Sequence, residues 1–199
     1  MNVVRTRSGR IWAAGHHVLY ASDDGGATWS EVRPGGLPSL DLHGFAADPE
    51  NADTIYAAVA GKGLYSSRDS GRKFSLVSKE VGPSVFGLGV TPAGRIFAAD
   101  TRRGVLASGD GGRSWKLVLR APVVGLAINP AQPKTVLATG AAIFLSRDGG
   151  RVWRKVFAPP KGAGPVAWAP SAPNIAYVVG FERRFYRTID GGRSWRPVS

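Results

Sequence analysis

Aspartate is the potentially reactive residue with the most regular spacing in this chain. Five aspartates each stand two residues after a serine or threonine and two residues before a glycine: Asp24, Asp69, Asp110, Asp148 and Asp190. Such carboxylates could act as catalytic acids or as metal ligands. Their intervals of 38 to 45 residues are those of a repeated structural unit, so the elements that carry them must be considered first.

Each aspartate lies in an eight-residue phrase, of which Ser108-Gly109-Asp110-Gly111-Gly112-Arg113-Ser114-Trp115 is representative. Asp and Ser side chains accept hydrogen bonds from nearby backbone N–H groups, and glycine adopts positive φ at little cost. Strand-like runs flank the phrase, so it predicts a β-hairpin turn. An aromatic residue ends each copy and is expected to cover the turn and bury a large area: Trp29, Phe74, Trp115, Trp153 and Trp195.

The phrase Ser/Thr-x-Asp-x-Gly-x-Ser/Thr-Trp/Phe resembles the Asp-box, or BNR repeat, of sialidase-like β-propellers, and its five copies span essentially the whole chain. Non-catalytic relatives include photosystem II assembly factor-like and sortilin-like propellers. The resemblance implies an all-β, five-bladed β-propeller of four-stranded antiparallel blades, each with an Asp-box hairpin between its third and fourth strands. It also implies that the boxes are scaffold, away from the ligand face. Lys73 and Val152 depart from the pattern, because a hydroxyl residue is usual there.

Short strand-like runs fill the intervals between the boxes. The second strands, such as Ile96–Ala99, are almost continuously apolar, which is typical of strands buried on both faces. Prolines at 49, 92, 130 and 170 follow the first strands of four blades and are expected to end them. A single propeller domain over 1–199 is predicted, with blades at about 1–33, 43–78, 83–120, 122–158 and 164–199.

The two chain ends are not predicted to share a blade. The first residue begins an innermost strand and Ser199 ends an outermost one, so closure of the ring would depend on packing between blades. Two alternatives stay open: a ring completed by a second copy, which would make a homo-oligomer, and a fragment of a longer natural chain.

Basic loops are the main candidates for a binding surface. The resemblance places the loops between second and third strands, and the crossovers between blades, on one face around a channel mouth. Arginine forks suit carboxylate, sulfate or phosphate. Alternatively these are solvated loop residues, with an arginine of each pair bound to Asp100 or Glu182. The ligand-binding candidates are His16, His17, Lys62, Arg102, Arg103, Glu182, Arg183 and Arg184.

Four more arginines directly follow the motif glycine: Arg72, Arg113, Arg151 and Arg193. They would form a basic ring on the opposite, box-bearing face. Repeat duplication alone accounts for their regularity, although a protein or membrane surface could use such a ring.

A catalytic pattern of the sialidase type is not found. Those enzymes need an arginine triad, a tyrosine nucleophile with a glutamate partner, and an acidic group for proton transfer. The nearest match to their Phe-Arg-Ile-Pro phrase, Gly9-Arg10-Ile11-Trp12, lacks the proline. Glu182 is the glutamate expected near the mouth, with Tyr186 four residues further on. The chain is therefore predicted not to be an enzyme.

A metal site built on the histidines is also not predicted. His16 and His17 are adjacent, so their side chains should point apart. His43 is the third histidine, and no supporting carboxylate can be located for this set from the sequence. We expect neither a metal nor another cofactor.

Composition limits the partners. The formal charge of +12 favours an acidic protein or acidic glycan. No nucleic-acid-binding pattern accompanies the charge, so a nucleic-acid partner is not expected.

No apolar run is long enough for a membrane helix, and the absence of cysteine excludes disulfides. Without a signal peptide the expected location is the cytoplasm, or the periplasm or exterior if a leader has been removed.

These observations predict a non-catalytic binding or assembly module that recognises an anionic or acidic partner at the basic mouth. The alternative is a glycan-binding or glycan-cleaving propeller of the sialidase-like kind that uses the same arginines.

Overall fold

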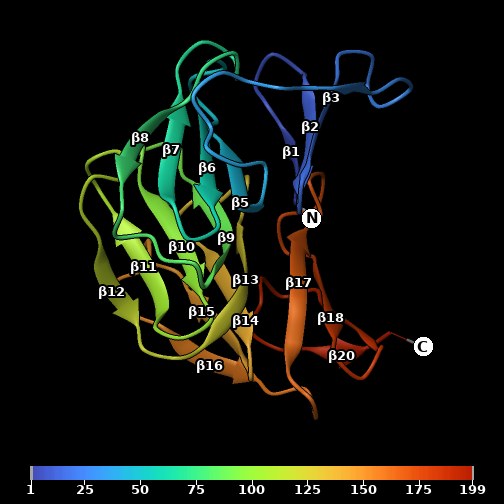
Figure 1. Ribbon diagram of the computed structural model, residues 1–199. Coiled ribbons are helices and arrows are strands. Elements are labelled where there is room, and N and C mark those ends of the chain that lie inside the picture. The colour runs from blue at the N-terminus through green and yellow to red at the C-terminus, as the bar shows by residue number, and fades with distance from the viewer. Residues whose placement is uncertain (1, 199) are drawn as a thin grey trace. The chain divides into compact units, whose positions relative to one another are not determined.

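The computed structural model describes residues 2–198. Within these residues, twenty strands form five four-stranded sheets, and each sheet consists of four strands that follow one another along the chain (Figure 1). The chain therefore has the predicted fold class: an all-β propeller with five four-stranded antiparallel blades. Within residues 2–198 no helix is long and apolar enough to cross a membrane.

The strand bounds follow the repeat. The first blade contains β1 (Asn2–Arg5), β2 (Ile11–Gly15), β3 (Val18–Ser22) and β4 (Ser30–Glu31). The second contains β5 (Leu42–Ala47), β6 (Ile55–Val59), β7 (Gly63–Ser67) and β8 (Ser75–Ser78). The third contains β9 (Val85–Val90), β10 (Ile96–Asp100), β11 (Gly104–Ser108) and β12 (Lys116–Leu119). The fourth contains β13 (Val123–Ile128), β14 (Val136–Gly140), β15 (Ile143–Ser146) and β16 (Arg154–Phe157). The fifth contains β17 (Ala163–Trp168), β18 (Ala176–Gly180), β19 (Phe185–Thr188) and β20 (Arg196–Pro197).

The innermost strands of four blades end where the prolines predict. β5 ends at Ala47, β9 at Val90, β13 at Ile128 and β17 at Trp168. Each end lies two residues before a proline, which cannot donate to a β-ladder.

The second strands are buried to different degrees. All residues of β10 and β14 are buried, as predicted from their apolar sequences. In β18 burial alternates instead, and Tyr177 is 41% exposed. The expectation of burial on both faces is therefore wrong for β18, where one face of the strand carries exposed side chains.

Contacts between residues divide the chain into two compact units. One comprises the residues up to Ala98 together with Ser108–Trp115, and the other comprises Ala99–Ala107 and the residues from Lys116 onward. The core of the first unit includes the buried residues Trp12, Leu19, Phe45, Ile55 and Phe74. The core of the second includes Leu137, Ile143, Trp168, Val178 and Trp195. Each core thus contains one of the box aromatics of its unit, Phe74 or Trp195.

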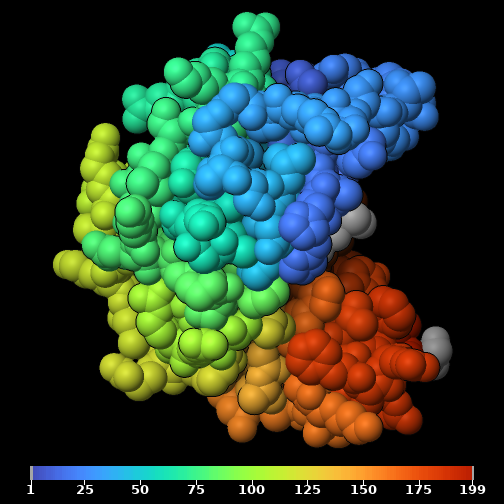
Figure 2. Space-filling view, viewed as in Figure 1, coloured from blue at the N-terminus to red at the C-terminus, as the bar shows by residue number. Residues whose placement is uncertain are grey.

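The crossover from β4 to β5 runs over the surface of the first unit, where its light-blue atoms are visible in Figure 2. Its backbone pairs with the second box: the Gly35 N–H donates to the Arg72 carbonyl at 3.0 Å, and the Phe74 N–H donates to the Gly35 carbonyl at 2.8 Å. Gly36 has φ +81°, and a Cβ there would lie 2.0 Å from the Phe74 carbonyl oxygen. Glycine is therefore required for this close approach.

Four box tryptophans cover their turns through the indole N–H, which donates to the motif glycine carbonyl. The Trp29 Nε1–Gly26 O distance is 3.0 Å, and Trp115, Trp153 and Trp195 form the same bond. The prediction that every box aromatic buries a large area is wrong for Trp29. Its side chain is 41% exposed, so this indole caps its turn without entering a core.

Candidate functional site

The five box carboxylates are occupied by hydrogen bonds from their own turns. Asp110 Oδ1 accepts the Ser108 hydroxyl at 2.8 Å, and the two Asp110 oxygens accept the Ser114 N–H and hydroxyl. The Ser108 Oγ in turn accepts the buried Gly112 N–H at 2.9 Å. The bonds at Asp24 are equivalent. This geometry suits a turn-forming residue better than a metal ligand or a catalytic acid, because each carboxylate already accepts several hydrogen bonds from its own turn.

The same hydrogen bonds lower the pKa of the box carboxylates. At Asp110 the Ser114 hydroxyl has the largest effect, followed by the Ser114 N–H, and the pKa lies well below its usual value. Burial alone would raise the pKa of Asp190, but the Ser194 and Thr188 hydroxyls and the Ser194 N–H lower it to about 2. The carboxylates are therefore ionised at neutral pH and unsuited to proton transfer there.

In the first unit the predicted mouth residues separate into two kinds. Lys62 and His17 are exposed loop residues, and His17 has φ +59°. His16 instead meets Asp41, with His16 Nδ1 lying 2.6 Å from Asp41 Oδ1. His43 joins them through Nε2, 3.5 Å from the same oxygen. The carboxylate that could not be located from the sequence is Asp41, which the β4–β5 crossover brings between the two histidines.

In the second unit the arginine pair after β10 is built around a buried carboxylate. Asp100 is fully buried, and its Oδ1 accepts the N–H groups of Arg102 and Arg103 at 2.8 and 2.9 Å. Arg103 Nε also donates to Asp100 Oδ2 at 2.8 Å. One guanidinium of the pair thus stabilises its own loop, while the exposed Arg102 side chain is directed to solvent.

The loop after β18 contains a second internal pair. The Tyr186 hydroxyl donates to Glu182 Oε1 at 2.5 Å, which lowers the pKa of Glu182 and raises that of Tyr186. A Cβ at Gly180 would lie 2.4 Å from Glu182 Oε1, so glycine makes room for the carboxylate. Tyr186 is buried, whereas Arg183 and Arg184 are exposed. The glutamate and tyrosine therefore bond to each other and leave the arginines on the surface.

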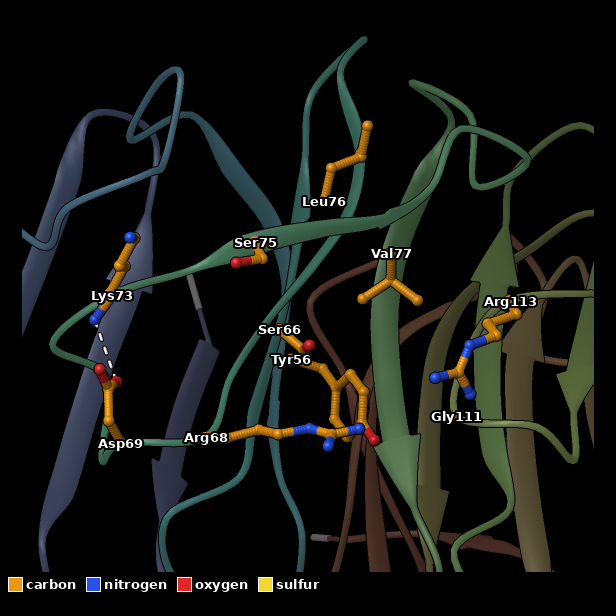
Figure 3. A pocket seen from close by; sticks show the side chains of 10 residues that line it. All are labelled: Tyr56, Ser66, Arg68, Asp69, Lys73, Ser75, Leu76, Val77, Gly111 and Arg113. Atoms are coloured by element: carbon orange, nitrogen blue, oxygen red, sulfur yellow. Dashed lines mark hydrogen bonds between the residues drawn. The ribbon is translucent and has the colours of Figure 1, made fainter.

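A groove of about 520 Å³ lies beside the second and third boxes (Figure 3). Arg68, Lys73 and Arg113 contribute positive charge to it, and Leu76 and Val77 contribute apolar surface. Figure 3 shows Arg68 extended alongside Tyr56, with Arg113 facing the groove from the next blade. The eight predicted mouth residues do not line this groove.

The groove has an unbalanced positive charge. Its carboxylate, Asp69, accepts the Ser67 hydroxyl at 2.7 Å and the Lys73 N–H at 3.0 Å within its own box. The Arg113 guanidinium is oriented by a 2.9 Å bond from Nη1 to the Asp110 carbonyl. Burial raises the pKa of Tyr56, and nearby Asp48 adds to this, whereas Arg68 and Arg113 act in the opposite direction. An anion in the groove would meet donors from two blades.

An equivalent groove of about 610 Å³ occurs in the second unit. Arg147 takes the place of Arg68, directly before the box aspartate, and Arg193 takes the place of Arg113. Arg193 Nη1 also donates to the carbonyl of its box aspartate, at 3.0 Å. Arg113 and Arg193 belong to the basic ring predicted from the sequence, whereas Arg68 and Arg147 were not among the predicted residues. The sequence feature that could have identified Arg68 and Arg147 is the Ser-Arg-Asp start shared by the second and fourth boxes.

The BNR/Asp-box repeat family matches residues 20–31, which contain the first box. No curated protein matches the chain. Among solved structures, the GH74 xyloglucanase from Xanthomonas campestris matches with a TM-score of 0.77 and 18% identity, covering 99% of this chain and 38% of that one. The GH74 enzyme from Niastella koreensis has a TM-score of 0.68 and 17% identity, over 96% of this chain and 36% of that one.

The structure of YCF48 bound to a D1 peptide matches with a TM-score of 0.62 and 13% identity, covering 99% of this chain and 80% of that one. At these identities the likeness concerns the fold. The chain spans less than two fifths of the length of the GH74 enzymes.

Proposed function

We propose that this chain, a propeller with a BNR/Asp-box repeat at residues 20–31, is a non-catalytic binding or assembly module that recognises an acidic segment of a partner protein. The observation that carries this proposal is the groove lined by Arg68, Lys73 and Arg113 together with the apolar side chains of Leu76 and Val77. The structure of YCF48 with a bound peptide supports a peptide as the ligand.

The chemistry of the groove favours carboxylates. An arginine guanidinium donates two parallel hydrogen bonds to a carboxylate, and Arg68 and Arg113 approach from different blades. Leu76 and Val77 offer apolar contact to the aliphatic part of a glutamate side chain. The net charge of +12 would attract an acidic segment over a longer range.

Fluorescence anisotropy with a labelled oligoglutamate peptide tests this function, with an oligolysine peptide as the charge control. We expect Arg68→Ala and Arg113→Ala each to weaken oligoglutamate binding by about tenfold, since a hydrogen bond to a charged group contributes about 1.5–3 kcal/mol. The double variant Arg102→Ala/Arg184→Ala removes exposed charge elsewhere and is the matched control.

The possible outcomes distinguish an incorrect binding site from an incorrect function. Loss of binding in the Arg102/Arg184 variant alone would move the site to the mouth predicted from the sequence. A chain that does not bind oligoglutamate at low salt, or binds oligolysine equally well, would contradict recognition of an acidic partner.

The alternative function is recognition or cleavage of a glycan. Glu182 and Tyr186 have the residue types of the tyrosine–glutamate pair that the resemblance associates with sialidases, but the Tyr186 side chain is 4% exposed. A buried hydroxyl that donates to its own glutamate is poorly placed to attack a substrate. We therefore expect no hydrolysis of a fluorogenic sialoside or of xyloglucan, and turnover that is lost in Glu182→Gln would contradict the non-catalytic proposal.

A further inference from the structure

Three side chains with metal-binding atoms meet on the first unit, away from the groove. His16 follows β2, Asp41 ends the β4–β5 crossover, and His43 lies in β5. The potential ligand atoms of these residues all lie within 4.8 Å of one another. Asp41 and His43 share a face because Leu42 between them points into the core, where it is 1% exposed. The arrangement therefore depends on strand alternation and on the crossover.

The hydrogen bonding of His43 leaves one of its ring nitrogens available to bind a cation. His43 Nδ1 lies 3.2 Å from the Pro83 carbonyl oxygen, which can only accept a hydrogen bond, so Nδ1 carries a proton. In neutral imidazole the other nitrogen, Nε2, then presents a lone pair. That lone pair faces Asp41 Oδ1 at 3.5 Å, which is also an acceptor. A cation bound at His43 Nε2 would therefore also meet the Asp41 carboxylate.

The surroundings hold His43 in this orientation. Its side chain is 12% exposed, and its ring stacks on Phe86 with centroids 4.4 Å apart. The His16 ring meets it edge-on at 4.9 Å. A hydrogen bond from the distal imidazole N–H to a backbone carbonyl is the usual outer-shell support of a metal-binding histidine, and Pro83 supplies that carbonyl.

One of the spacings between the ligand atoms already matches a small tetrahedral ion, and the others require a small movement of His16. Zn–N and Zn–O bonds of about 2.0–2.2 Å place neighbouring ligand atoms roughly 3.3–3.5 Å apart. The His43 Nε2–Asp41 Oδ1 distance is 3.5 Å. The 2.6 Å contact between His16 Nδ1 and Asp41 Oδ1 would lengthen when the ion replaces the shared proton. The His16 side chain is 65% exposed, so it can make this small movement.

We propose that His16, Asp41 and His43 bind one divalent transition-metal ion of the Zn²⁺ class. Two imidazoles and one carboxylate suit Zn²⁺, whereas Ca²⁺ and Mg²⁺ require more oxygen ligands. Three protein ligands leave a fourth position open on the solvent side of His16. The three proposed ligands do not line the groove that contains Arg68 and Arg113, so the metal site does not depend on the proposed function.

Isothermal titration of the chelator-treated chain with Zn²⁺ tests the site. We expect one ion per chain, with the affinity lowered at least about tenfold in His16→Ala and in Asp41→Asn, because each variant removes one of three ligands. His17→Ala is the matched control, since it removes the neighbouring exposed imidazole. It should bind Zn²⁺ like the unaltered chain.

A spectroscopic measurement keeps the result interpretable if a variant is less stable. Co²⁺ added to the unaltered chain should produce the visible bands of a tetrahedral ion, and Zn²⁺ should remove them. His43→Ala should abolish the bands while near-ultraviolet circular dichroism reports whether the fold persists. Failure to bind either ion, equal weakening by His16→Ala and His17→Ala, or bands that persist in His16→Ala and Asp41→Asn would overturn the proposal.

Discussion

At the scale of single residues, one amino-acid type has different roles in this chain. Asp110 accepts hydrogen bonds from its own turn, Asp100 holds the backbone of an arginine loop, and Asp41 contacts two histidines. The first two are surrounded by donors that the protein itself supplies. Asp41 also faces the acceptor lone pair of His43, which makes it the carboxylate best placed for an added cation.

The lowered pKa values of the box aspartates predict acid sensitivity. A carboxyl group whose pKa is lower in the folded than in the unfolded state stabilises the fold above its unfolded pKa, and this stabilisation is lost as pH falls through the folded value. The window runs from the ordinary value of 3.8 down to about 2, the value at Asp190. Urea unfolding should therefore show stability falling steeply below about pH 4.

Asp110→Ala tests the origin of this effect. We expect the variant to be less stable at pH 7, because the Ser108 and Ser114 hydroxyls lose their acceptor, and to lose less stability on acidification than the unaltered chain. Asp23→Ala, which changes an exposed carboxylate outside the motif position, is the control. An Asp110→Ala chain with unchanged stability and lost peptide binding would reverse the scaffold assignment.

At the scale of elements, the β4–β5 crossover lies close against the second box in the first unit. Gly36 and Gly61 both have positive φ, but a Cβ at Gly36 would meet the Phe74 carbonyl at 2.0 Å, whereas a Cβ at Gly61 has nothing within 4 Å. The two positions therefore share the backbone strain of a non-glycine residue and differ in the clash.

Alanine substitutions at these two glycines should distinguish the stability cost of backbone strain from the cost of the steric clash. Gly61→Ala should lower the free energy of unfolding by about 1 kcal/mol, from positive φ alone. Gly36→Ala should lower it by about 3 kcal/mol or more, because the crossover must also move away from the box. Urea unfolding of both variants measures the difference, and equal losses would show that the crossover is not tightly held against Phe74.

At the scale of the whole molecule, the net charge of +12 acts on association rather than on the fold. Charge steering raises association rates and is screened within about 10 Å at 0.1 M salt. The association rate of oligoglutamate should therefore fall steeply as salt rises, while its dissociation rate changes less. Stopped-flow measurements test this, and a rate that is independent of salt would argue for an apolar mode of recognition.

Much of the fold could be predicted from the sequence because its signals are local. The aspartate and the first serine or threonine of each box form their side-chain hydrogen bonds within eight residues, as in Ser108–Trp115, so the phrase itself specifies the hairpin. Proline two residues beyond the innermost strand ends β5, β9, β13 and β17 in the same way. The burial of individual faces was less predictable, as Trp29 and Tyr177 show, because it depends on what packs against a strand.

The sequence by itself therefore determined the repeat, the turns and the five four-stranded blades of this protein. The tertiary structure decided which side chains meet. Asp41 reaches His16 across 25 residues, and Arg68 and Arg113 line one groove from successive blades. The physical reason is that these contacts depend on the path of a crossover and the packing of one blade on the next, which no local hydrogen-bond pattern specifies.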